Sequence, residues 1–144
     1  MRLYDVRVSL PACCFLLSLA WLVKASDSKN PHSWSEESDA GNFVAELVAP
    51  ASDIGLSQFQ SWQLSIRDAV SNQAITQARI VVGGGMAAHG HGLPTQPQVT
   101  KHLGDGVYLV EGLMFNMAGE WQLIFDVNTK KVSDRIVFDV IIQN

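Results

Sequence analysis

A two-residue alternation of apolar and polar side chains constrains the fold of this 144-residue chain most strongly. Trp62, Leu64 and Ile66 alternate with polar residues, and a similar alternation recurs over 119–127 and 133–142. Because successive side chains of a β-strand point to opposite faces, such a pattern places one set of apolar side chains on a single face of a sheet. The repeat of 3.6 residues that marks an amphipathic helix is not found. The chain is therefore predicted to be all-β.

Seven segments are predicted to form strands, and turns or loops separate them. Their approximate ranges are 43–49, 61–68, 77–83, 97–103, 106–112, 119–127 and 133–142. Gly104-Asp105-Gly106 predicts a tight hairpin between the fourth and fifth strands, and Asn128–Lys131 predicts a turn between the last two. Seven short strands within about 100 residues are typical of an immunoglobulin-like β-sandwich. We predict one such domain over residues 43–144.

The first 25 residues have the features of an export signal. Arg2 and Arg7 precede a 16-residue apolar run, Val8–Val23, and small or apolar residues stand at positions −3 and −1 of a cut after Ala25. This combination is typical of a secretory signal peptide, and the run is shorter than the roughly 20 residues that span a bilayer. We expect residues 1–25 to be removed and the mature protein to be periplasmic or secreted. An uncleaved membrane anchor is the alternative.

The composition of the remaining chain excludes several classes of function. Both cysteines, Cys13 and Cys14, lie in the expected signal, so the mature protein would have no disulfide, no thiolate metal site and no cysteine nucleophile. Without residues 1–25 the chain has 7 Lys and Arg against 13 Asp and Glu, a net charge of −6. Nucleic acid is therefore not an expected partner, and an anionic membrane would repel the protein unless the signal is kept. Residues 26–42 are expected to form a flexible acidic lead-in.

A glycine-rich stretch between the third and fourth predicted strands holds the residues best suited to bind a metal. His89 and His91 stand two residues apart, and Met86 stands three residues before them. Imidazole binds copper, zinc, nickel and iron, whereas the soft thioether of methionine selects Cu(I). Gly90 would let the chain turn so that both imidazoles reach one ion. Glycines 83–85 are interpreted as allowing the loop to wrap a small metal centre.

A second methionine-containing loop is expected at the same end of the domain. In an immunoglobulin-type sandwich the loops after the first, third and fifth strands share one end, so Leu113–Ala118 would face the histidines. We predict a Cu(I) site formed by His89 and His91 with Met86 or Met117. Both methionines are also compatible with filling gaps at the end of the core, which is the commoner use of methionine.

Three motifs follow one another between about Phe43 and the C-terminus. They read GGGMxxHGHGLPTxPxVT, LGDGxYxVEGLxFxM and GxWxLxF. Because it contains these motifs in this order, the chain resembles the YtkA-like family of small exported bacterial domains. More distantly, it is similar to FixH-type proteins. The resemblance implies an immunoglobulin-like sandwich outside the cytoplasm, with a link to copper or to the handling of respiratory oxidases.

Three classes of function remain compatible with the sequence. The first is an exported copper carrier or respiratory-oxidase assembly factor. The second is a metal-free interaction module that docks on an envelope or respiratory complex. The third is an enzyme with a histidine-bound metal, for which the converging loops supply no general base and no paired carboxylates. We rank them in that order and expect a copper-binding protein that is not an enzyme.

Overall fold

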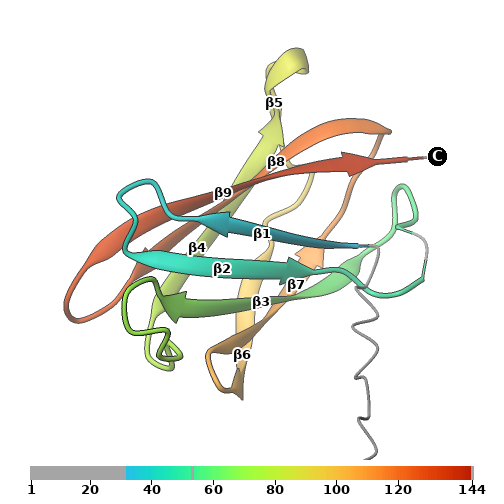
Figure 1. Cartoon of the computed structure of the whole chain (residues 1–144). Coiled ribbons are helices and arrows are strands. Elements are labelled where there is room, and N and C mark those ends of the chain that lie inside the picture. The colour runs from blue at the N-terminus through green and yellow to red at the C-terminus, as the bar shows by residue number, and fades with distance from the viewer. Residues whose placement is uncertain (1–31, 53, 144) are drawn as a thin grey trace, which may run out of the picture.

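The computed structural model describes residues 32–52 and 54–143. The expected signal peptide, residues 1–25, and the first residues of the lead-in lie outside this part of the chain. Nine strands form two antiparallel sheets that stack on each other (Figure 1). The strands are β1 Ser33–Glu37, β2 Phe43–Val48, β3 Gln60–Asp68, β4 Arg79–Met86, β5 His91–Gly92, β6 Gln98–Gly104, β7 Val107–Leu113, β8 Gly119–Asn128 and β9 Ser133–Ile142. Within the described ranges there is no α-helix, and no helix could cross a membrane.

The topology is that of an immunoglobulin domain with two added strands. The strand orders are β1-β2-β3-β7-β6 in one sheet and β5-β4-β8-β9 in the other. Without β1 and β5, four strands pack on three in the constant-type arrangement ABED on CFG. The remaining seven strands match the seven predicted ones, with ends displaced by at most three residues. Asp105 and Gly106, both with positive φ, form the predicted hairpin turn between β6 and β7. The predicted immunoglobulin-like sandwich is confirmed.

One hydrophobic core lies between the two sheets. The alternation in β3 points Trp62, Leu64 and Ile66 inward, and each of these side chains is fully buried. In the opposite sheet, Phe125 and Phe138 meet edge to face with ring centroids 5.7 Å apart, a favourable aromatic geometry. The period-2 pattern of the sequence is therefore the pattern of the core.

Part of the expected flexible lead-in is a strand, which corrects the interpretation of residues 26–42. β1 pairs antiparallel with β2 along five residues, from Ser33 opposite Val48 to Glu37 opposite Val44. The ring of Trp34 stacks on Trp62 with centroids 5.3 Å apart and planes 3° from parallel. The segment reads SWSEE, so a single aromatic residue marks its inward face. One residue cannot establish an alternation, so the strand is recognised only from its pairing with β2 and from the contact of Trp34 with Trp62.

Replacing Trp34 with alanine tests whether β1 belongs to the folded domain. We expect Trp34→Ala to lower the free energy of unfolding by about 2 kcal/mol, because it removes a stacked, partly buried aromatic ring. Chemical denaturation measures the change, with Glu36→Ala on the same strand as control. Glu36 is exposed, so its replacement should change the stability by less than about 0.5 kcal/mol. Equal effects of the two substitutions would mean that β1 is not docked.

The turn between β1 and β2 is tied to the other sheet by Asp134, near the start of β9. Its carboxylate accepts hydrogen bonds from the backbone amides of Ala40 and Asn42, at 3.1 and 3.3 Å, and from the Asn42 side chain at 2.8 Å. Burial raises the pKa of the Asp134 carboxyl, but hydrogen bonds from Ser38, Asn42 and neighbouring amides outweigh burial. They hold this pKa well below its ordinary value.

The lowered pKa of Asp134 predicts a pH dependence of stability. A carboxyl whose pKa is lower in the folded state contributes stability above its unfolded value, near pH 4, and this contribution is lost as the pH falls further. We expect Asp134→Asn to lower the free energy of unfolding at pH 7 by on the order of 1 kcal/mol, after allowance for solvent screening. The difference from wild type should shrink below pH 4. Glu46→Gln, at an exposed acid on β2, serves as the control and should keep the wild-type dependence of the free energy of unfolding on pH. If the curve for Asp134→Asn runs parallel to that of the wild type, the carboxylate does not contribute as described.

Candidate metal centre

The glycines before the histidines belong to strand β4 rather than to a loop. β4 runs three residues further than predicted, to Met86, and so contains all of 83–85. A Cβ atom on Gly84 would overlap the backbone carbonyl of Gln122 in β8, and one on Gly85 would overlap that of His91 in β5. These two glycines are therefore required by the close approach of neighbouring strands. This corrects the interpretation that they allow the loop to wrap a metal.

The two histidines lie at a tip that projects beyond the sheets at the end of β4 (Figure 1). β4 passes into a single 3-10 turn, η1 (Ala87–His89), and β5 follows it. Gly90, with φ of 66°, closes the turn, and its N–H donates to the Met86 carbonyl at 3.0 Å. The returning chain is anchored by the Thr95 hydroxyl, which donates to the Gly112 carbonyl on β7 at 2.6 Å. The tip is therefore held at both of its ends.

His89 and His91 are exposed neighbours with ring centroids 5.9 Å apart. The Nδ1 atom of His91 lies 3.1 Å from the carbonyl oxygen of Gly92. A carbonyl can only accept a hydrogen bond, so we assign the proton to Nδ1, which leaves the lone pair on Nε2. Histidines that bind metals commonly have their second ring nitrogen held in this way. In this tautomer Nε2 is the ring nitrogen of His91 whose lone pair could act as a ligand.

The two candidate methionines differ in accessibility. Met86 lies directly opposite His91 in the β4–β5 pairing, so both side chains leave the same face of the sheet. The Met86 side chain is only 3% exposed, and its Cε atom packs against Gly119, so it fills the end of the core in this structure. Met117 is 37% exposed. Of the two methionines, Met117 is therefore the more exposed residue.

Trp121 brings the two loops together at one end of the sandwich, which we call the Met/His pole. Its ring meets the His91 ring edge to face, with centroids 5.7 Å apart and planes at 67°. Its Nε1 donates a hydrogen bond of 3.2 Å to the Met117 carbonyl. The predicted convergence of the loops after the third and fifth sandwich strands is thus confirmed. Trp121 occupies the corner where many immunoglobulin domains place a tyrosine that bonds back to the preceding loop.

The Met/His pole is connected to the core by a continuous series of aromatic rings. Successive centroids are 5.3, 5.5, 5.3 and 5.7 Å apart. The series consists of Trp34, Trp62, Phe115, Trp121 and His91. Pairs of aromatic rings at such distances attract one another beyond the effect of burial. The series therefore links His91, through Trp121, to the buried rings of the core.

Carboxylates that the sequence analysis did not place here lie beside the tip. Glu120 and Asp139 line a cavity of about 430 Å³ that η1 borders through Ala87 and Ala88. Among the described residues, no three His, Cys, Asp or Glu side chains are close enough together to hold a metal ion. A third ligand beside the two histidines would therefore have to be of another kind, and thioether sulfur is one candidate. The nearby acids give the approach a negative potential.

Fold and site together define a small immunoglobulin-like sandwich that carries histidine and methionine at one pole. The model of the YtkA-like family matches residues 44–126, which is more than half of the chain, and the protein belongs to this family. Comparison with curated proteins and with solved structures found no match. The more distant resemblance to FixH-type proteins stays a prediction.

Proposed function

We propose that the protein is exported and binds one Cu(I) ion at the Met/His pole, as a copper carrier or respiratory-oxidase assembly factor rather than an enzyme. The ligands would be His89 and His91 with Met86 or Met117. The observation that carries this proposal is the contact of Trp121 with both His91 and the Met117 backbone. It brings two imidazoles and a thioether-bearing loop to one place.

The chemistry of these groups favours Cu(I) over other common metals. Thioether is a soft ligand that selects Cu(I), and zinc gains little from it. Calcium and magnesium prefer oxygen ligands, and none of the four proposed ligand side chains contains oxygen. His89, His91 and Met117 are exposed, so a donor or acceptor protein can reach the ion. Ready access suits transfer of copper to an envelope or respiratory partner.

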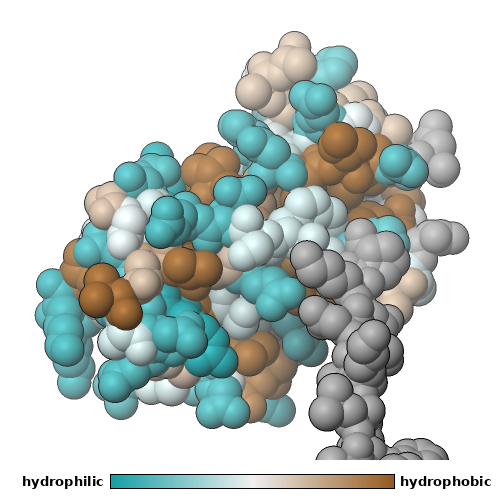
Figure 2. Space-filling view, viewed as in Figure 1, coloured by the Kyte–Doolittle hydropathy of each residue, from teal (hydrophilic) through white to brown (hydrophobic). Residues whose placement is uncertain are grey.

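The competing interaction-module proposal is less well supported by the described surface. The large exposed apolar side chains come from seven different strands and loops, and on the face in Figure 2 polar residues separate the apolar ones. These side chains are Val44, Phe59, Val70, Val81, Leu103, Met117 and Ile141. A docking surface for a stable partner usually has a contiguous apolar centre. Their distribution over seven elements gives the interaction module less support than a single apolar patch would.

Metal retention tests the proposed function. The protein is purified anaerobically, offered Cu(I), Cu(II) and Zn(II) together, desalted, and analysed for metal content. We expect about one copper per chain and little zinc. If no metal is retained, the interaction module takes the place of the copper carrier. Retained zinc accompanied by hydrolytic activity would instead favour an enzyme.

A further inference from the structure

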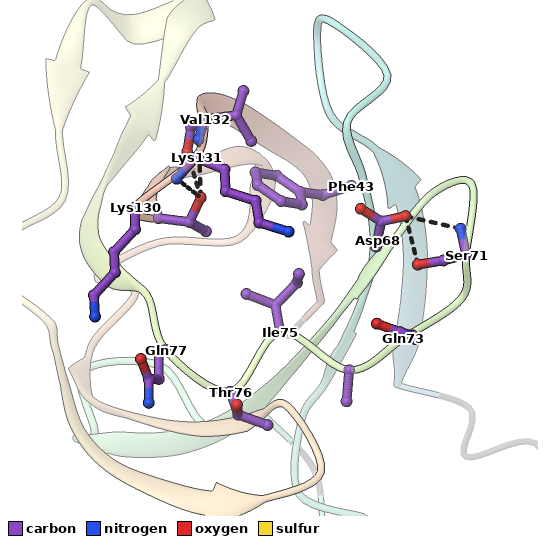
Figure 3. A pocket seen from close by; sticks show the side chains of 12 residues that line it. Phe43, Asp68, Ser71, Gln73, Ile75, Thr76, Gln77, Lys130, Lys131 and Val132 are labelled. Atoms are coloured by element: carbon purple, nitrogen blue, oxygen red, sulfur yellow. Dashed lines mark hydrogen bonds between the residues drawn. The ribbon is translucent and has the colours of Figure 1, made fainter.

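A second cavity lies at the end of the sandwich opposite the Met/His pole. It has a volume of about 360 Å³ and opens between loop 69–78, which joins β3 to β4, and the β8–β9 turn (Figure 3). This volume falls in the range of about 300–1,000 Å³ that is usual for small-molecule sites. The loops are those that follow the second and sixth sandwich strands. They belong to the end that carries the binding loops in antibody variable domains.

The lining of this cavity combines an apolar floor with two ammonium groups. Ile75 and Val132, which are partly buried, supply the apolar surface, whereas Phe43 is 1% exposed and contributes little of it. Lys130 and Lys131 extend from the β8–β9 turn. In Figure 3 the Lys131 ammonium lies between Phe43 and Ile75, and Lys130 lies on the same side as Gln77. A ligand in this space would meet hydrocarbon below and positive charge along one wall.

Neither lysine forms a salt bridge within the part of the chain that the structure describes. Within residues 32–52 and 54–143 the single salt bridge joins Arg135 to Asp126. The acid on the cavity wall is Asp68, and its Oδ1 already accepts hydrogen bonds from the Ser71 amide and hydroxyl, both at 2.8 Å. These bonds, and more weakly the charge of Lys131, lower the pKa of Asp68, which therefore stays ionised. The cavity holds two positive charges against one negative charge in a chain of net charge −4.

Hydrogen bonds hold the backbone of both loops that border the cavity. The Ile75 amide donates to the Ile66 carbonyl at 3.0 Å, and the Tyr108 hydroxyl donates to the Ile75 carbonyl at 2.7 Å. On the other side, Thr129 closes the turn through its hydroxyl, which accepts from the Val132 amide at 3.0 Å. Preformed walls lower the entropic cost of binding.

Hydrogen-bonding side chains at the rim are also available. Gln73, Thr76 and Gln77 line the cavity. Their side chains take part in none of the hydrogen bonds formed within the part of the chain that the structure describes. They can therefore serve a polar ligand without losing an internal contact.

We propose that this cavity binds a small organic monocarboxylate. The carboxylate would lie against the ammonium groups of Lys130 and Lys131, with hydrogen bonds from the glutamines at the rim. The hydrocarbon part would cover Ile75 and Val132. An anion without an apolar part leaves the floor uncovered, and a doubly charged anion is repelled by Asp68, so a single carboxylate with a short chain or ring fits best.

Amide chemical shifts of the full mature chain, free of copper, test this site with benzoate as the probe. We expect saturable shifts for residues 73–77 and 130–132. Benzyl alcohol, which has the ring without the charge, and inorganic phosphate, which has the charge without the ring, should each bind at least about tenfold more weakly, because each lacks one of the two contacts. The histidine loop should not shift, and the result is independent of copper binding.

Charge-removing variants complete the test. Lys131→Gln should weaken benzoate binding about tenfold, the loss of one charge-assisted contact. Lys101→Gln, at an exposed lysine on β6 that does not line the cavity, should bind as wild type does. The proposal is overturned if benzoate produces no saturable shift, if benzyl alcohol or phosphate binds as well, or if the two variants behave alike.

Discussion

Replacing Trp121 with alanine is expected to lower the free energy of unfolding by about 3–5 kcal/mol. The side chain is fully buried and meets Phe115 edge to face, with centroids 5.3 Å apart. Its removal leaves a cavity between the sheets and deprives the Met117 carbonyl of its donor. A loss of this size is a large part of the roughly 5–15 kcal/mol that stabilises a typical domain.

Chemical denaturation of Trp121→Ala and Trp121→Phe measures this loss and separates its two causes. Phenylalanine keeps most of the buried ring but cannot donate to Met117, so Trp121→Phe should cost about 1–2 kcal/mol. If Trp121→Ala shifts the stability by less than about 1 kcal/mol, the side chain is not buried and the inward face of β8 is wrong.

The alternation of side chains was sufficient to predict seven strands and their connection into a sandwich. It could not predict β1, because Trp34 alone marks the inward face, nor β5, which has two residues. It also ended β4 too early, since Gly84 and Gly85 have no side chains with which to continue a pattern. Both glycines serve strand contacts that arise only in the folded chain.

The candidate site, like the strands, could be predicted only in part. The spacing of His89 and His91 is local, and the convergence of their loop with Met117 follows from strand order alone. The direction of a side chain depends on register, which the sequence does not specify. For this reason the burial of Met86 and the edge-to-face contact of Trp121 with His91 became visible only in the structure.

Loss of either histidine is expected to abolish tight Cu(I) binding. His89→Ala and His91→Ala each remove an imidazole ligand, and both positions lie on the exposed tip, so the variants should fold. Met117→Ala is the sharper test of the two-loop site because Met117 is 26 residues from His91 in sequence. We expect it to weaken Cu(I) binding at least about tenfold unless Met86 supplies the sulfur.

His102→Ala provides a matched control for loss of a histidine. His102 lies on β6 with its ring 4.8 Å from that of Tyr108, and the fold places it away from the tip. Its removal tests whether exposed imidazole by itself accounts for copper uptake. Denaturation of each variant separates loss of ligand from loss of fold.

An anaerobic Cu(I) competition titration on the wild type and these variants tests the central claim most directly. The account predicts that wild type and His102→Ala take one Cu(I) per chain from the competing chelator, and that His89→Ala and His91→Ala do not. If Met117→Ala alone behaves as wild type, the tip binds copper with Met86 as its sulfur ligand. Failure of the wild type to compete, or wild-type binding by both His89→Ala and His91→Ala, would contradict the proposed copper site.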